Sequence, residues 1–143
     1  MKQFFQNVQS LLGLFILVSF TMIACNQYAD GSKKVAYGKN SVYYKGDATE
    51  ADAKKLGDYL RAGGKYFDDS NECSVMVEKH NGAFTAKLVV DSAKIKSAAD
   101  LKDDTYNFIA GELSRDVYEG KAITVEVTDG NFKTLKTYYA KGS

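Results

Sequence analysis

The dipeptide Asn81-Gly82 constrains the fold of this chain more than any other feature of the sequence. Two runs of alternating apolar residues flank it, and Asn-Gly in that setting is typical of a two-residue β-hairpin turn. A loop of that length fixes the register, so that Val75 lies opposite Leu88 on one face of the hairpin. The same alternation places Cys73 on that face, and we therefore expect the Cys73 thiol to lie in the core.

Two segments combine a capping signal with helical spacing of apolar residues. The pattern Thr-x-x-Asp opens residues 50–62, with Thr49 as the expected N-cap. The pattern Ser-x-x-Asp opens residues 98–119, with Ser97 as the expected N-cap. The glycine pair at 63–64 is typical of a helix stop. We expect one helix over each segment, and the predicted buried stripe of the second consists of Leu101, Thr105, Phe108, Ile109, Leu113 and Val117.

Strands are predicted around these helices. Alternating or β-branched residues indicate strands at 41–45, 123–127 and 132–139, and a short strand can precede the first of them. The Asp-Gly pair at 129–130 predicts a two-residue turn, but its register suits the last strand poorly, so we expect a bulge or an edge strand there. The order favours an α+β two-layer sandwich: a ferredoxin-like βαββαβ unit plus one extra strand, forming an antiparallel sheet with two helices on one face.

Residues 11–25 indicate the compartment in which the protein works. They form an apolar run after a weakly basic start, and the run ends in a small residue followed by Cys25. The last four residues, Met-Ile-Ala-Cys, resemble the cleavage box of bacterial lipoproteins, with Met22 where Leu is usual. An uncleaved anchor helix is the alternative, although about 15 apolar residues are fewer than the roughly 20 that span a bilayer.

This interpretation divides the chain into three parts. Residues 1–24 are a lipoprotein signal peptide, residues 25–34 are the lipidated cysteine and a flexible tether, and residues 35–143 are a single α+β domain. Cys25 is the predicted lipidation site, with palmitate among its acyl groups. We expect the protein in the bacterial cell envelope, anchored to a membrane through lipid and facing the periplasm or the exterior.

Charge and cysteine content exclude several classes of protein. The chain has 19 basic and 18 acidic residues, and residues 1–24 carry only Lys2, so the remainder has a net charge of zero. A neutral domain without a basic block is a poor candidate for binding nucleic acid. The chain has two cysteines, so lipid on Cys25 would leave Cys73 without a partner and exclude a disulfide framework.

Motifs that carry chemistry are weak or missing in the sequence. His80 is the only histidine, and it lies at the expected hairpin tip, so no histidine-based triad or metal site can be assembled. Acid pairs at 68–69 and 103–104 raise the possibility of calcium, but they lack the spacing of an EF-hand. The glycine pair at 63–64 lacks the pattern of a phosphate-binding loop. We predict no catalytic residue, no metal site and no cofactor.

Three runs carry a resemblance to known proteins: SVYYKGDATEADAKKLGDYL, SVMVEKHNGAFTAKLVV and AITVEVTDGNFKTLKTY. The resemblance covers about residues 41–139. They resemble a module of uncharacterised bacterial membrane-anchored proteins and lipoproteins. The resemblance implies a single α+β domain, and it brings no established activity and no catalytic residues.

These observations favour a non-enzymatic interaction or assembly module that binds a protein partner in the cell envelope. A small envelope enzyme that uses carboxylates and tyrosines is one alternative, and a lipoprotein that binds a small ligand or calcium is another. If both helices cover one face of the sheet, the other face is open to a partner. The predicted members of that open face include Tyr43, Met76, Lys87, Val89, Thr124 and Glu126. Strand addition at the edge strand 132–139 is a second route to a partner.

Overall fold

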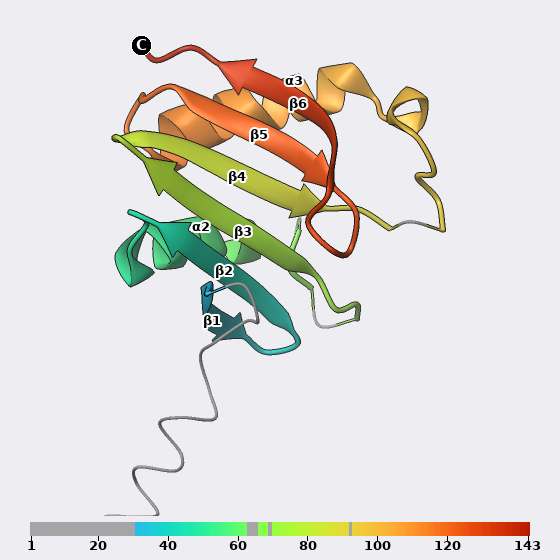
Figure 1. The fold of residues 1–143 in the computed structure, drawn as a ribbon, viewed down its shortest axis with the longest axis horizontal. Coiled ribbons are helices and arrows are strands. Elements are labelled where there is room, and N and C mark those ends of the chain that lie inside the picture. The colour runs from blue at the N-terminus through green and yellow to red at the C-terminus, as the bar shows by residue number, and fades with distance from the viewer. Residues whose placement is uncertain (1–30, 63–65, 69, 92) are drawn as a thin grey trace, which may run out of the picture.

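The computed structural model describes residues 31–62, 66–68, 70–91 and 93–143, and these form a six-stranded sheet with helices behind it (Figure 1). The strands lie side by side in the order in which they occur in the chain. They are β1 (Lys33–Tyr37), β2 (Asn40–Gly46), β3 (Ser74–His80), β4 (Ala83–Val89), β5 (Ile123–Thr128) and β6 (Thr134–Ala140).

Three antiparallel hairpins are joined by two helical crossovers. The hairpins are β1–β2, β3–β4 and β5–β6. Helix α2 (Glu50–Arg61) leads from β2 to the parallel strand β3. Helix α3 (Asp103–Glu112) continues into the π-helical turn η3 (Leu113–Val117) and leads from β4 to the parallel strand β5. The sheet is therefore mixed.

The α+β class and the placement of both helices on one face are confirmed (Figure 1). The expectation of an antiparallel sheet is wrong, because each helical crossover joins strands that run in the same direction. The ferredoxin-like layout is not confirmed either. In that layout two βαβ units interlock, whereas here each crossover joins immediate neighbours and the strand order stays sequential.

The β3–β4 hairpin has the predicted register. Val75 lies opposite Leu88, and the turn residues Asn81 and Gly82 have φ angles of 51° and 82°. Two consecutive positive φ values are the geometry of a type I′ turn, and Asn-Gly adopts it readily. The register that the turn predicts agrees with the tertiary structure, because it places the apolar residues of both strands on the face that packs in the core.

Helix α2 begins as the sequence predicts. The Asp52 N–H donates to Thr49 Oγ1 at 3.2 Å, and the Thr49 N–H donates to the Asp52 carboxylate at 2.8 Å, which closes the capping box. Its buried residues are Ala53, Leu56, Gly57 and Leu60. The Tyr37 ring of β1 lies against Gly57, where a Cβ would collide with it. The glycine stop predicted at 63–64 lies outside the described residues.

The second predicted helix is interrupted. Ser97 and Asp100 form the expected capping box, but it closes only the short 3₁₀ turn η2 (Ala98–Asp100). Leu101 then turns extended and is buried, so the helical phase restarts at α3. As a result Ile109 faces the core, whereas Phe108 is 63% exposed and Thr105 is exposed as well, so the predicted places of these two residues in the buried stripe are wrong.

The last hairpin contains the expected bulge, at Val127 and Thr128. Its turn spans residues 129–133 instead of two residues, because the Asp129 carboxylate accepts hydrogen bonds from two backbone N–H groups of this loop. Phe132 has a φ of 60°, and its ring meets Tyr43 edge to face at 5.7 Å. The loop therefore reaches back over the sheet face that carries no helices.

Candidate functional site

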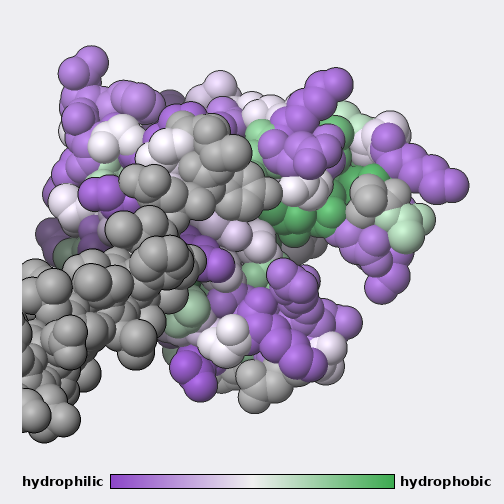
Figure 2. All heavy atoms as spheres, turned by 60° about the horizontal axis from the view of Figure 1, so that its bottom comes forward, coloured by the Kyte–Doolittle hydropathy of each residue, from purple (hydrophilic) through white to green (hydrophobic). Residues whose placement is uncertain are grey.

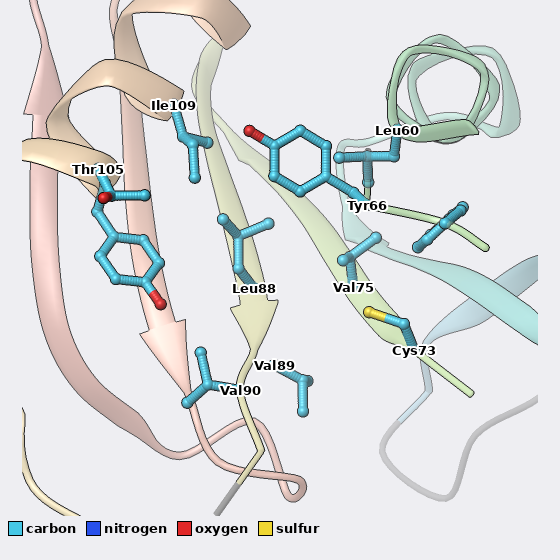
Figure 3. Close-up of a pocket in the computed structure, with 11 residues that line it drawn as sticks. Leu60, Tyr66, Cys73, Val75, Leu88, Val89, Val90, Thr105 and Ile109 are labelled. Carbon is cyan, nitrogen blue, oxygen red and sulfur yellow. The ribbon is translucent and has the colours of Figure 1, made fainter. Parts of the chain in front are cut away.

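A mostly apolar pocket of about 230 Å³ lies between the two helices, over the middle of the sheet (Figure 3). Its floor includes Val75 of β3 and Leu88 of β4, which belong to the face that the helices cover. Leu60 of α2 and Ile109 of α3 stand on opposite sides of it. Helix α2 packs over β1 to β3 and helix α3 packs over β5 and β6, so the pocket forms where the two helices diverge.

The polar groups of this inner pocket are uncharged in the physiological range. They include the phenols of Tyr66 and Tyr106 and the thiol of Cys73. Burial raises the pKa of all three groups, so each keeps its proton well above pH 7. The inner pocket therefore offers apolar surface and neutral hydrogen-bonding groups.

Cys73 itself is half-buried instead of fully buried as expected. The thiol was predicted to pack in the same layer as Val75 and Leu88, and it does lie beside them. It precedes the first residue of β3, however, and so it forms part of the pocket wall at the end of the sheet. Its raised pKa is the opposite of what a nucleophilic thiol requires.

A second, more polar pocket of about 610 Å³ adjoins the first. The two share the lining residues Tyr66, Cys73, Val89 and Val90, so the two pockets adjoin at these residues. The charged residues that line the outer pocket are Asp68, Glu72, Asp91 and Lys94. Among the described residues that line it, three carboxylates against one ammonium give the outer pocket a net formal charge of −2.

Asn40 is hydrogen-bonded to both ends of a segment that lines the outer pocket. Its side chain is 2% exposed, its Nδ2 donates to the Asp68 carbonyl at 3.0 Å, and its Oδ1 accepts from the Cys73 N–H at 2.9 Å. One amide side chain thus satisfies a backbone group at each end of residues 68–73. The position of these pocket residues depends on Asn40.

Four of the residues predicted for the open face of the sheet lie side by side on neighbouring strands. Tyr43, Met76, Lys87 and Glu126 are aligned in one row across β2 to β5. Met76 is only 2% exposed and Tyr43 only 9%, so these two side chains present little surface to a partner. Thr124 is half-buried.

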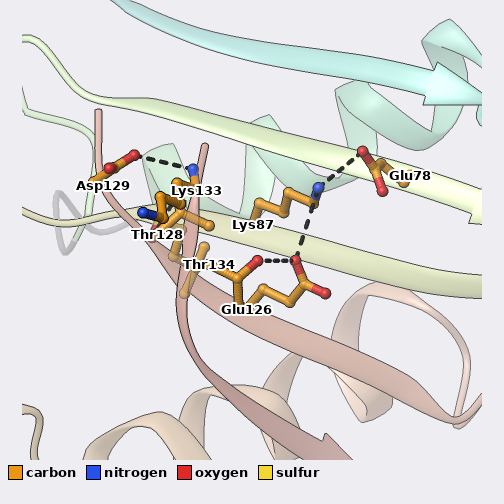
Figure 4. Close-up of polar contacts among 8 residues, drawn as sticks. Glu78, Lys87, Glu126, Thr128, Asp129, Lys133 and Thr134 are labelled. Carbon is orange, nitrogen blue, oxygen red and sulfur yellow. Dashed lines mark hydrogen bonds and ion pairs between the residues drawn. The ribbon is translucent and has the colours of Figure 1, made fainter. Parts of the chain in front are cut away.

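The charges on this face are already paired (Figure 4). Lys87 Nζ lies 3.0 Å from a carboxylate oxygen of Glu78 and 3.7 Å from one of Glu126. The Thr134 hydroxyl donates to Glu126 at 2.8 Å. The remaining predicted member, Val89, lines both pockets at the end of β4. Of the residues predicted for the open face, Lys87 and Glu126 are thus engaged in ion pairs or hydrogen bonds, Tyr43 and Met76 are buried, and Val89 lines the pockets.

Exposed apolar surface is limited elsewhere. On the face drawn in Figure 2, hydrophobic residues gather in one area that hydrophilic residues border. Among the residues that the structure describes, the exposed large hydrophobic side chains are Phe108 of α3 and Tyr139 of β6, the latter 72% exposed. They are single side chains on different elements, and single exposed apolar residues are ordinary on protein surfaces.

Groups suited to acid–base or metal chemistry are not assembled within the described ranges. Every carboxylate there with a resolved pKa shift has a lowered pKa, as in Asp103, where hydrogen bonds from Lys136 and Tyr138 stabilise the charged form. No group of three or more His, Cys, Asp and Glu residues there is placed to hold a metal ion. His80 ends β3 at the hairpin tip, as predicted.

The predicted lipidation site Cys25 and the apolar run before it lie outside the described residues, so the anchor stays a prediction. Within the described part of the chain, no helix has the length and apolar content needed to cross a membrane.

Sequence reasoning missed the two pockets and the role of Asn40. The pocket residues come from segments as far apart as 60–75, 88–94 and 105–109, and no local spacing links them. The one signal in the sequence was an asparagine next to a predicted strand, since Asn is depleted in strands unless its amide has specific partners.

The fold and the pockets define a two-layer α+β domain with an apolar pocket between its helices and a more polar pocket beside it. A family model described as a family N-terminal domain, AF_1994_N, matches residues 34–139. Because this match covers most of the chain, the protein belongs to that family, which is uncharacterised. No curated protein and no solved structure matches the chain.

Proposed function

We propose that this protein is a non-enzymatic binding module of the bacterial cell envelope, held at a membrane by lipid on Cys25, and that it binds a small organic ligand in the pocket between its helices. The observation that carries the proposal is the inner pocket of about 230 Å³, with its apolar floor and its uncharged polar groups. Concave, mainly apolar sites with a few polar groups are where proteins bind small molecules.

Binding is favoured over catalysis by the chemistry of the pocket lining. A hydrolase or isomerase needs a base or a nucleophile whose pKa is tuned towards the working pH. The inner pocket offers phenols and a thiol whose pKa values are moved away from neutrality. These groups can orient a ligand by hydrogen bonding, and they are poorly suited to removing a proton from it.

Binding in the pocket is also favoured over docking on the open sheet face. Met76 and Tyr43 would have to supply the apolar contacts of such an interface, and both are nearly inaccessible. The charged groups beside them are satisfied by one another. The protein partner that the sequence predicts remains a prediction, and the pocket is the better supported site.

A neutral aromatic probe tests the binding proposal. We expect 2-phenylethanol to bind the full-length protein saturably in the millimolar range and to shift the methyl NMR signals of Leu88, Val90 and Ile109. Val90→Phe places a ring in the pocket and should abolish these shifts, and Thr105→Phe blocks it from the other wall. Val35→Phe, at a half-buried valine outside both pockets, should leave binding intact.

An absence of saturable shifts in the wild-type protein would overturn the proposal. Binding that survives both blocking variants, each shown to be folded by its own NMR spectrum, would overturn it as well, because the probe would then occupy another site.

The anchor is tested separately in cells. Cys25→Ala should move the protein from the detergent-rich phase to the aqueous phase, because the acylated residue is lost. Cys73→Ala is the matched control and should stay in the detergent-rich phase. A Cys25→Ala protein that partitions like the parent would refute lipidation and favour the uncleaved anchor.

A further inference from the structure

We infer that the ligand of this domain is a small organic cation: an apolar group fills the inner pocket while a positively charged group lies in the outer pocket beside Asp68, Glu72 and Asp91. The inference rests on the proposed function, since it assigns the ligand of the same pocket. Its carrying observation is the contrast between the described linings of the two adjoining pockets: one is mainly apolar and uncharged, and the other bears a net formal charge of −2.

The inner pocket limits the size of the apolar group. A dry cavity of roughly 150 Å³ lined by aliphatic and aromatic side chains accommodates a benzene ring. The pocket here, at about 230 Å³, suits one aromatic ring or an alkyl group of similar volume, and it is smaller than the sites of drug-sized molecules. Since the Tyr66, Tyr106 and Cys73 side chains are neutral, an ionised group gains nothing there and loses its hydration.

The outer pocket contains a carboxylate oxygen that accepts no hydrogen bond from the described residues. The hydrogen bonds that Asp68 accepts from Ser70 and Asn71 all end on Oδ1. They lower the pKa of Asp68, with the Ser70 hydroxyl as the largest cause, so the group is a carboxylate at neutral pH. Its second oxygen has no hydrogen bond among the described residues.

Lys94, the cation among the described residues that line the outer pocket, compensates these charges only weakly. Lys94 Nζ is 4.0 Å from Asp91 Oδ2, and its side chain is 83% exposed. An exposed ion pair at that distance contributes little, so Lys94 leaves the pocket acidic. A ligand that carried a carboxylate could pair with Lys94, but it would face three carboxylates of the same sign.

The two pockets share a wall, which sets the shape of the ligand. Tyr66, Cys73, Val89 and Val90 line both pockets, so a short linker passes these side chains between the apolar and the charged end of the ligand. Phenethylammonium has this form: one ring, two methylene groups and an ammonium. The neutral 2-phenylethanol and the anionic 3-phenylpropanoate have nearly the same shape and serve as charge controls.

The affinities of these three probes for the full-length protein, measured by NMR titration at low salt, test the inference. We expect phenethylammonium to bind about tenfold more tightly than 2-phenylethanol, and 3-phenylpropanoate to bind more weakly than either. Because the preference is electrostatic, it should shrink as salt is added.

Charge removal in the outer pocket supplies the decisive variant. Glu72→Gln combined with Asp91→Asn should reduce the preference for the cation to about threefold or less and leave the affinity for 2-phenylethanol unchanged. Glu50→Gln combined with Glu119→Gln removes the same charge outside both pockets and should keep the preference.

The outcomes separate the two proposals. If 2-phenylethanol does not bind, the proposed function fails. If it binds but phenethylammonium binds no more tightly, or 3-phenylpropanoate binds best, the pocket is a ligand site and the assignment of a cation is wrong. A preference that persists in the Glu72→Gln and Asp91→Asn double variant would also overturn the assignment.

Discussion

Asn40 shows how much one side chain can organise in this domain. It is a polar residue in the core, where an unpaired amide would be costly, yet both of its functional groups are satisfied by backbone atoms from a segment about thirty residues further along the chain. The amide of Asn40 therefore links the start of β2 to the loop that lines the outer pocket. Its role is structural, and it supports the site without touching the ligand.

Asn40→Ala should destabilise the domain by about 2–4 kcal/mol, because the Asp68 carbonyl and the Cys73 N–H both lose a partner in a buried setting. Urea denaturation measures this as a lower midpoint with an unchanged slope. The native Cys73 thiol should also react faster with a thiol reagent as the loop loosens. Asn107→Ala, on the exposed side of α3, is the control, and an equal loss of stability there would refute the role of Asn40.

The two capping boxes show that a local signal has different consequences in different elements. At α2 the box is followed by a run of residues that bury Ala53, Leu56 and Leu60, so the helix continues for three turns. After the box at Ser97 the next residue, Leu101, gains more by turning extended into the core than by continuing the helix. Burial of an apolar side chain thus determines how far the helix extends.

Thr49→Ala should lower the free energy of unfolding by about 1 kcal/mol, because α2 loses its N-cap. The loss should affect the whole domain, since α2 packs against three strands of the sheet. Ser97→Ala should cost less than about 0.5 kcal/mol, because its box closes a 3₁₀ turn with no buried residue. Urea midpoints of the two variants, measured side by side, give the comparison. Equal losses would show that the box matters by itself, independently of the element that it starts.

Three phenol–carboxylate hydrogen bonds tie the layers of the molecule together. Tyr37 of β1 donates to Asp58 of α2 at 3.0 Å, and Tyr138 of β6 donates to Asp103 of α3 at 2.8 Å. The third bond, at 2.8 Å, joins the two helices and runs from Tyr59 to Glu112. In each case the pKa of the phenol is raised. Burial is the largest cause, and the hydrogen bond to the carboxylate is the second.

We expect the thermal stability of the domain to be nearly constant from pH 7 to 9 and to fall as the pH rises above about 10. Burial and Asp58 raise the pKa of Tyr37 to about 12, against 10.0 for the free phenol. Above pH 10 the unfolded chain therefore releases protons that the folded chain retains, which favours unfolding, and the contribution of Tyr37 is lost as the pH passes its folded pKa. Melting temperatures across this range measure the effect.

Tyr37→Phe should flatten the alkaline decline, because one of the retained protons is then absent. Tyr139→Phe is the matched control, since this side chain is 72% exposed. An alkaline decline that is equally steep in Tyr37→Phe would refute this account.

Local chemistry alone determined several features of this protein. The Asn81-Gly82 turn specified the register of β3 and β4, and the Thr49 box specified the start of α2, because each depends on residues within a few positions of one another. The bulge in the last hairpin followed from the mismatch between its turn and its alternation.

Only the tertiary structure decided the sheet order, the break at Leu101, the burial of Met76 and the pockets. The parallel pairings of β2 with β3 and of β4 with β5 depend on where each helical crossover returns the chain to the sheet. The alternation of residues along a strand does not indicate which strand will be its neighbour. Met76 is buried on a face that alternation assigns to the outside. The pocket exists because two helices separated by more than forty residues diverge over β3 and β4, and no short stretch of sequence encodes the space between them.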